Sequence, residues 1–180
     1  LPALVTAATS LGKSFSYCSS ASNVSQQLLG KLGSGTSEFY AGSAFPPLSA
    51  KGDFPLLAEF EQEMKAEQEA GNEDADLTKG VIPFNAMRSW LGMRIIEQVA
   101  ADVEGELDNE SLLAALRKAK VDLGGVVPTL DFSKPVAAKG FERFFNPEMR
   151  LVKWDPSQKD YVLTDVEPQN TLELLGGGAS

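Results

Sequence analysis

Few residues in this sequence belong to the types that carry out covalent chemistry. The 180-residue chain contains no histidine and a single cysteine, Cys18. Serine-histidine-aspartate and cysteine-histidine catalysis both need an imidazole base, and zinc sites are built mainly from cysteine and histidine. The composition therefore argues against these enzymes and against zinc or iron centres. One cysteine also excludes an internal disulfide, and Cys18 is expected to be a partly buried thiol.

Carboxylates are plentiful, with 25 Asp and Glu residues, but the sequence predicts no two of them to be buried together. The acidic loop 71–80 lacks the central glycine and the distal glutamate of a calcium-binding EF-hand. The glycine-rich stretch LGKLGSG lacks the Lys-Ser/Thr pair and the following helix of a phosphate-binding loop. The sequence consequently predicts no catalytic residue, no metal site and no cofactor.

The net charge of -9 limits the partners that the chain can have. Nucleic acids and anionic membrane surfaces are bound through clustered Lys and Arg residues, and the 16 basic residues here are scattered. No apolar run approaches the roughly 20 residues of a membrane-spanning helix. The N-terminus has neither an initiator methionine nor the pattern of a signal peptide. Neither nucleic-acid binding nor direct membrane insertion is expected.

The first part of the chain has a strand-helix-strand rhythm. PALVTAA (2–8) is a short apolar run that predicts a buried strand, and a serine-rich loop follows it. A helix is predicted over 22–33, with Ser22 as its N-cap and Gly33 at its C-terminal end. A strand is predicted over 37–45, and Pro46 and Pro47 stop it. In such a βαβ unit, ligands bind at the carboxyl ends of the strands.

The middle of the chain is predicted to be helical. Apolar residues at helical spacing predict helices over 53–71 and 81–103, and the second is apolar on nearly all sides and therefore expected to be buried. Asp108 is the expected N-cap of a third helix over 109–120. After two glycines, strand patterns return: a strand over 126–132 and a hairpin made of 149–155 and 160–166.

Four segments, taken in order, are more informative than any single motif. They are YAGSAFPPLSAKGDFPLLAEFEQEM, FNAMRSWLGMRIIEQV, ESLLAALRKAKVDLGGVVPTLDFSKP and RFFNPEMRLVKWDPSQKDYVLTDVEP. This order resembles the C-terminal half of type I periplasmic binding proteins, and most closely the branched-chain amino acid branch of the ABC-transporter substrate-binding family. The resemblance covers residues 38 to 166, and the first 37 residues fit as the last strand-helix unit of the second lobe.

The resemblance implies an α/β fold of the periplasmic-binding-protein type I class, a Rossmann-like two-lobe fold of which this chain would cover only part. Residues 1–47 would be the last strand-helix-strand portion of one lobe up to a hinge, and 48–132 a helical and strand portion of the other lobe. Residues 133–166 would make the final hinge crossing and the closing β-hairpin, and 167–180 a flexible tail. Phe45, Pro46, Pro47 and Phe132 would lie at the hinge crossings.

The resemblance also implies that a small molecule binds in the cleft between the lobes. Thr9 and Ser10 would follow the first strand, where many family members have a polar or acidic ligand contact. The segment AATS holds no carboxylate, which leaves ligands other than amino acids open. Phe84 and Asn85 stand at the start of the long helix that often borders the ligand, although core packing is the more ordinary role of such a phenylalanine.

These features predict a non-enzymatic solute-binding component of an ABC importer, or a fragment of one, that binds a small polar ligand such as an amino acid and closes by hinge motion. The expected partners are the ligand, a membrane permease, and either the missing N-terminal half or another copy of the chain. The expected location is periplasmic or extracellular in a bacterium, with a lipid anchor in the missing part as one option. A sensory or regulatory ligand-binding domain of the same fold is the alternative. A flavodoxin-like α/β enzyme is disfavoured, because histidine, a phosphate-binding loop and an acid-base pair are all missing.

Overall fold

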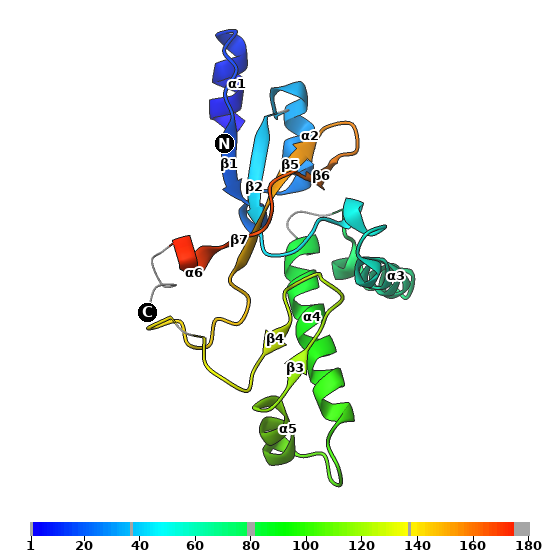
Figure 1. Ribbon diagram of the computed structural model, residues 1–180. Coiled ribbons are helices and arrows are strands. Elements are labelled where there is room, and N and C mark those ends of the chain that lie inside the picture. The colour runs from blue at the N-terminus through cyan, green and yellow to red at the C-terminus, as the bar shows by residue number, and fades with distance from the viewer. Residues whose placement is uncertain (1, 37, 79–81, 137, 175–180) are drawn as a thin grey trace.

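Two groups of packed elements, each around its own cluster of buried side chains, make up most of the chain (Figure 1). The computed structural model describes residues 2–36, 38–78, 82–136 and 138–174. We call the first group the sheet unit; it contains α1 (Pro2–Ser10), β1 (Tyr17–Ser20), the 3-10 helix η1 (Ala21–Asn23), α2 (Gln26–Leu32), η2 (Gly33–Thr36), β2 (Phe39–Ser43), β5 (Glu148–Asp155) and β6 (Asp160–Leu163). We call the second group the helical unit; it contains η3 (Leu48–Ala50), α3 (Pro55–Glu69), η4 (Glu73–Ala75), α4 (Ile82–Ala101), α5 (Asn109–Leu116), β3 (Lys120–Val121) and β4 (Leu130–Asp131).

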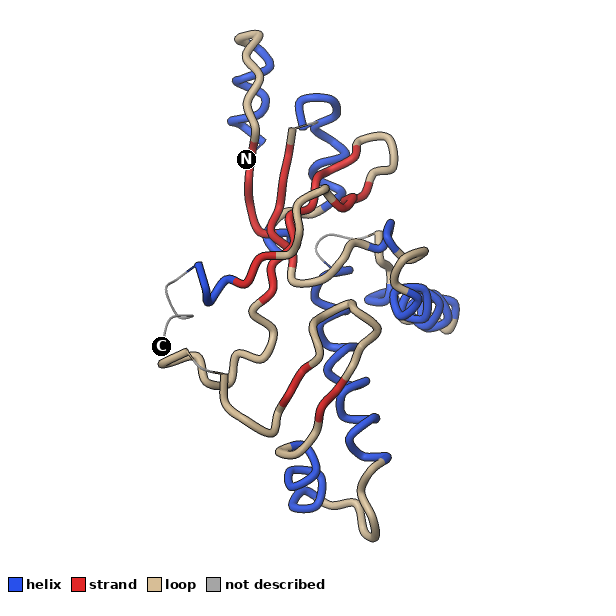
Figure 2. Tube along the Cα trace, viewed as in Figure 1, coloured by secondary structure: helices blue, strands red, loops and turns tan. Residues whose placement is uncertain are grey.

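The sheet unit is built on strands in the order β1-β2-β5-β6 (Figure 2). Strands β1 and β2 are parallel, as expected for a βαβ unit that contains α2. Strand β5 pairs antiparallel with β2, with Ala41 opposite Val152 and Ser43 opposite Arg150. Strand β6 pairs antiparallel with β5, and it ends at Leu163. The predicted strand over 37–45 is thus confirmed with shorter bounds, and residue 37 lies outside the described residues. The predicted hairpin is confirmed as well, although β5 begins one residue earlier than predicted and β6 ends three residues earlier.

The segment predicted as the first strand is a helix, α1. Its alanines favour a helix, and Val5 and Ala8, one turn apart, are its buried residues. The hydroxyl of Thr9 donates to the carbonyl oxygen of Val5 at 2.9 Å, and Ser10 bonds in the same way to the preceding turn. The prediction was wrong because a short run of apolar and β-branched residues is compatible with either structure, and here the spacing of the two buried residues is helical.

The first strand is instead β1, which lies in the segment that was predicted to be a loop. Cys18 on this strand is exposed, contrary to the expected partial burial. The following helix starts later than predicted, because the side chain of Ser25 rather than that of Ser22 caps it and accepts the N–H of Leu28 at 3.1 Å. The helix ends where predicted, at Gly33, whose φ is 62°.

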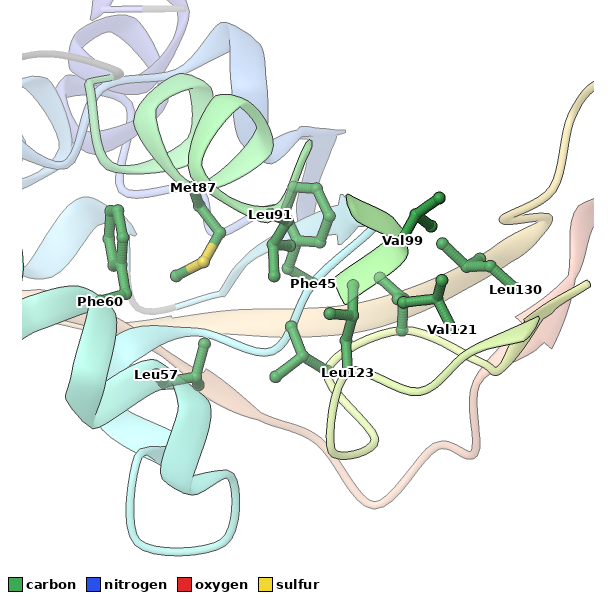
Figure 3. Packing of buried hydrophobic residues seen from close by; sticks show 11 residues of the cluster. Phe45, Leu57, Phe60, Met87, Leu91, Val99, Val121, Leu123 and Leu130 are labelled. Atoms are coloured by element: carbon green, nitrogen blue, oxygen red, sulfur yellow. The ribbon is translucent and has the colours of Figure 1, made fainter. Parts of the chain in front are cut away.

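The core of the helical unit lies between α3, α4 and the segment that holds β3 and β4 (Figure 3). Leu57 and Phe60 of α3 are completely buried, and they pack in the same cluster as Met87 and Leu91 of α4. The other side of the cluster consists of Val121, Leu123 and Leu130. Helix α3 begins with Pro55 in its first turn, as predicted, because that position needs no backbone N–H donor.

Helix α4 is less buried than its sequence predicts. Met93 is 56% exposed and Ile96 is 42% exposed, whereas Val99 on the same helix is 2% exposed. The predicted start of this helix, residue 81, lies outside the described residues. The described part of the chain therefore covers only one side of a helix that is apolar on most sides.

A ring-and-ion cluster joins the outer surfaces of α3 and α4. The guanidinium carbon of Arg94 lies 4.7 Å from the centroid of the Trp90 ring. The guanidinium nitrogens of Arg94 form ion pairs with Glu63, with Glu59 at 3.6 Å and with Glu97 at 3.0 Å. All five side chains belong to α3 or α4, so this cluster acts within the helical unit.

Helix α5 is capped as predicted, but it ends early. The Asp108 carboxylate accepts the N–H groups of Glu110 at 3.0 Å and Ser111 at 2.8 Å. The helix stops at Leu116, and Lys120, predicted to lie in its last turn, is part of β3 instead.

The stretch after the paired glycines is mostly a turn. Gly124 and Gly125 have φ of 60° and 76°, which glycine adopts without strain. Only Leu130 and Asp131 of the predicted strand 126–132 pair with a neighbour, β3. Pro128 precedes this short strand, and so the strand contains no proline.

The predicted flexible tail, 167–180, is ordered over part of its length. Strand β7 (Gln169–Asn170) pairs with the start of β5, with Asn170 opposite Glu148. Helix α6 (Thr171–Leu174) follows, and its Leu172 is 6% exposed. Residues 169–174 thus form regular structure within the predicted tail, and residues 175–180 lie outside the described residues.

Two connections carry the chain between the units (Figure 2). The first, 44–47, leads from β2 to η3, and the second, 132–147, leads from β4 to β5. The side-chain amide of Asn146 in the second connection donates to the carbonyl oxygen of Ala44 in the first at 3.4 Å. The two connections therefore lie side by side at the edge of the sheet.

We expect the Phe60→Ala substitution to lower the free energy of unfolding by about 3–5 kcal/mol, because it leaves a cavity in the core of the helical unit. Urea unfolding followed by circular dichroism measures this loss. The matched control is Gln68→Ala on the exposed face of the same helix, which should change stability by less than about 0.5 kcal/mol. Equal effects of the two substitutions would contradict the observed packing of α3.

The Asp131 carboxylate gives a second prediction. The hydroxyl of Ser133, aided by its backbone N–H and by Lys120, lowers the pKa of Asp131 from 3.8 to about 2. At pH values above the ordinary pKa of 3.8, the ionised carboxylate therefore stabilises the fold. This stabilisation is lost as the pH falls toward 2. We expect the stability difference between wild type and Asp131→Asn to shrink over that range in urea unfolding at several pH values.

The Ser133→Ala variant is the control for this pH dependence, because it removes the hydroxyl donor and should move the loss to higher pH. If the difference between wild type and Asp131→Asn stayed constant as the pH fell from the ordinary pKa of 3.8 to about 2, the fold would not stabilise the ionised form of Asp131. That result would contradict the hydrogen bonding described for this carboxylate.

Candidate functional site

A partly enclosed cavity of about 60 Å³ lies at the junction of the two units. Both units and the first connection contribute to its walls. The sheet unit supplies side chains from η1, α2, β5 and β6, and the helical unit supplies Phe84 and Met87 from the first turns of α4. The lining residues of the first connection are Phe45, Pro46 and Pro47.

The walls of this cavity are largely apolar. The rings of Phe45 and Phe84 lie 5.1 Å apart, centroid to centroid, in a tilted arrangement. Phe84 packs against the buried clusters of both units, whereas Phe45 and Met87 belong to the cluster of the helical unit. Val24 and Val152 of the sheet unit complete the apolar surface. Phe84 is therefore the side chain through which the two cores meet.

The polar groups gather at the side formed by α2 and β6. The Asp160 carboxylate accepts a hydrogen bond from the side-chain amide of Gln26 and another from the backbone N–H of Tyr161, at 2.7 Å. Burial raises the pKa of Asp160 above its usual range, because removal from water disfavours the charged form. No ion-pair partner of Asp160 is found in the part of the chain that the structure describes. This carboxylate is thus held by neutral donors.

Tyr161 contributes a polar group without a partner. The residue lines the cavity and is 6% exposed, and its phenol oxygen makes no hydrogen bond to any described residue. Burial raises the pKa of this phenol well above its ordinary value, so it stays protonated. A buried hydroxyl without a partner costs free energy.

A surface basin of about 640 Å³ adjoins the cavity. Gln26, Leu48 and Asp160 line both hollows, so the basin opens next to the polar side of the cavity. The basin also carries charged side chains of both signs: Lys31, Lys51, Lys159 and Glu61. A solute that enters from the basin would first meet this mixed charged surface.

The carboxyl ends of β1 and β2 lie at the edge of the sheet that faces the cavity. Ser20 ends β1, and its hydroxyl is 2.8 Å from that of Ser22. Ser43 ends β2, lines the cavity and is 5% exposed. These serines are polar groups at the position where ligands bind in parallel sheets. The sequence pattern missed Ser20 and Ser22 because β1 was expected at residues 2–8.

The residues predicted to form the site are only partly brought together. Phe84 lines the cavity, and the predicted hinge residues Phe45, Pro46 and Pro47 line it with Phe84. Asn85 is exposed next to Phe84 and is not part of the lining. The ligand role of Phe84 and Asn85, and the hinge role of the other three, stay predictions.

Thr9 and Ser10 lie elsewhere. They are exposed at the end of α1, not in a loop after a strand, and their hydroxyls are bonded to the helix backbone. The strand on which their predicted position depended does not exist. Phe132 is half-buried, and its ring centroid lies 4.7 Å from that of Phe145. Phe132 begins the second connection and Phe145 lies near its end, so this contact brings the two ends of the connection together.

Gln26, Asp160 and Tyr161 were not predicted as site residues. Gln26 is far from Asp160 and Tyr161 in the sequence, and only the fold brings α2 and β6 next to each other. Within the described ranges, no cluster of three or more Cys, Asp and Glu residues could hold a metal ion. Each helix among the described residues falls short of the length or the hydropathy that a membrane-spanning helix needs.

Comparisons with known proteins find similarity in structure only. No family model matches the chain, and no curated protein matches its sequence. A fatty acid ABC transporter substrate-binding protein from Thermomonospora curvata is similar over 94% of this chain, with a TM-score of 0.61 and 19% identity. A possible leucine/isoleucine/valine-binding protein from Rhodopirellula baltica SH 1 is similar over 97%, with a TM-score of 0.54 and 16% identity.

The chain spans well under half of these two proteins, 40% of the first and 41% of the second. The similarity extends over nearly the whole of this chain, 94% of it in the first comparison and 97% in the second. The mixed α/β chain thus has part of the type I periplasmic binding protein fold.

Proposed function

We propose that the chain is part of a solute-binding, non-enzymatic protein of an ABC importer. In this proposal, a small solute binds at the junction of the two units, which close around it by rotation about the two connections. The observation that carries the proposal is the cavity, whose walls come from both units and from the first connection. A solute at that position would contact both moving parts, which is the requirement for coupling binding to closure.

The two structural neighbours support this role. The names of both describe solute-binding proteins, one for fatty acids and one for leucine, isoleucine or valine. Their solutes share an apolar body with one polar end. The cavity has the same character, with Phe45, Phe84 and Met87 on one side and Asp160 and Gln26 on the other. We infer a solute with a compact apolar body and a polar group, and an amino acid with an aliphatic side chain is the first candidate.

The volume of the cavity supports a role for motion. A space of about 60 Å³ is small, since each water molecule takes about 30 Å³ in the liquid. In this proposal, the units separate slightly to admit the solute and then close around it. The adjoining basin, which shares Asp160 with the cavity, provides a route of entry.

The proposed partners follow from the same role. They are the solute, a membrane permease that reads the closed form, and further polypeptide that completes the fold, either the missing N-terminal half or another copy. The exposed apolar residues Leu4, Met93 and Ile96 support the last point, because they lie on helices whose other sides are packed. The proposed location is periplasmic or extracellular in a bacterium.

A sensory or regulatory domain of the same fold is the second candidate. Such a domain would bind a solute by the same closure but would pass the signal to another domain instead of a permease. The genes next to this one discriminate between the two roles, since permease and ATPase genes would favour transport.

We expect Phe84→Ala to weaken solute binding about tenfold or more, which corresponds to about 1.4 kcal/mol or more. The reason is that Phe84 supplies apolar wall and also joins the two cores. A thermal-shift screen of the natural gene product with amino acids and small carboxylic acids would find the solute. Isothermal titration with the best solute would then measure the change in affinity.

The matched control is Phe141→Ala, because Phe141 is 49% exposed and does not line the cavity. It should leave the affinity unchanged. Equal loss of affinity in both variants would indicate a general effect on stability. Unchanged affinity in Phe84→Ala would place the solute elsewhere and refute the proposed site.

A further prediction concerns the size of the natural protein. We expect the native gene product, or its complex, to have a mass well above the 19.3 kDa of this chain, because the fold is completed by other polypeptide. Native mass spectrometry measures this. A monomer of 19.3 kDa with a cooperative thermal transition would refute the need for a completing partner.

A further inference from the structure

Arg150 connects the two units through its side chain. Its backbone belongs to β5 of the sheet unit, where it is the ladder partner of Ser43 at the end of β2. Its side chain leaves the sheet and reaches the helical unit. One guanidinium nitrogen, Nη2, donates to the carbonyl oxygen of Gly125 at 3.1 Å. The guanidinium carbon lies 5.4 Å from the centroid of the Phe54 ring.

The two groups that receive Arg150 are themselves fixed in the helical unit. Phe54 immediately precedes α3 and packs against the buried cluster of this unit. Gly125 lies in the turn between β3 and β4, and the next residue, Val126, is completely buried. The position of a Cβ atom on Gly125 would be 3.7 Å from the Phe54 ring. The Gly125 carbonyl and the Phe54 ring therefore lie next to each other and together form the surface that the guanidinium contacts.

The environment of the Arg150 charge makes the contact specific. Its side chain is only 15% exposed, and the nearest carboxylate in an ion pair is that of Glu148 at 3.9 Å, on the same strand. A long ion pair, a carbonyl and a ring face thus balance a largely buried cation. Separation of the units would remove the carbonyl and the ring together, and would leave the cation with Glu148 and water.

We propose that Arg150 is an interlobe latch, a positioning residue that holds the sheet unit and the helical unit in the contacting arrangement seen here. A rotation about the two connections moves the β5 backbone with one unit and moves Phe54 and Gly125 with the other. The latch must therefore open whenever the units separate. This deepens the proposed function, because it rests on the hinge motion proposed above and sets the balance between the open and closed forms.

Interlobe distances measured by pulsed electron spin resonance test the latch without any solute. In the natural, full-length protein with Cys18→Ser, spin labels are attached after Lys31→Cys in α2 and Lys118→Cys beyond α5. The wild-type background should give one main distance. We expect Arg150→Met to broaden this distribution about twofold or to add a second population, since the units then rotate more freely. Arg150→Lys, which keeps the charge but loses the planar guanidinium, should give an intermediate result.

The matched control is Arg94→Met. Arg94 also lies over an aromatic ring, that of Trp90, and forms ion pairs, but all its partners are on α3 and α4 of one unit. It should lower thermal stability without changing the interlobe distance. Phe54→Leu should broaden the distribution in part, and the double variant with Arg150→Met should add little, because both remove the same contact.

The outcomes separate the latch from the proposed function. An unchanged distribution in Arg150→Met, or equal broadening in Arg94→Met, would overturn the latch. Broadening in Arg150→Met alone would support it even if no solute were found. A solute that narrows the wild-type distribution, together with an unchanged Arg150→Met distribution, would leave the proposed function standing and refute the latch.

Discussion

The antiparallel pairing of β2 with β5 is the constraint on which the rest of the arrangement depends. The chain leaves the sheet after Ser43 and returns to it before Arg150, and these two residues are partners in the ladder. Because antiparallel neighbours run in opposite directions, the end of β2 and the start of β5 lie at the same edge of the sheet. The whole helical unit is thus an excursion that begins and ends at one place, which explains why two connections suffice to hold it there.

This edge of the sheet also determines where a solute can act. The carboxyl ends of the parallel strands β1 and β2 meet there, and the first turns of α4 reach it through Phe84. A body held by two adjacent connections can rotate about them at small cost, whereas its contacts away from the connections must break. The first connection lines part of the cavity, and Arg150 contacts the helical unit from a position next to both connections, so a rotation would change both sets of contacts. Binding and opening therefore depend on the same junction, although by different side chains.

Sequence patterns predicted the elements whose signals are local. Pro55 and Asp108 mark the starts of α3 and α5, because a missing N–H and a capping carboxylate act on the neighbouring turn alone. The hairpin of β5 and β6 was predictable for the same reason, since its turn follows Asp155 directly. The family resemblance supplied the fold, and its partial coverage agrees with the share of the two neighbours that the chain spans.

The remaining features depend on contacts that no local pattern contains. Strand β1 is rich in serine and forms because β2 offers it a parallel partner, and α1 is a helix although its residues also suit a strand. The polar side of the cavity requires Gln26 of α2 and Asp160 of β6, and each has an ordinary local role, one in a first helical turn and one after a hairpin turn. Gln26 and Asp160 come together because of the strand order β1-β2-β5-β6, in which β6 pairs with β5 on the side away from β2. A candidate site of this kind can be found only once the three-dimensional structure is known, because no local sequence pattern distinguishes its polar residues from other polar residues of the surface.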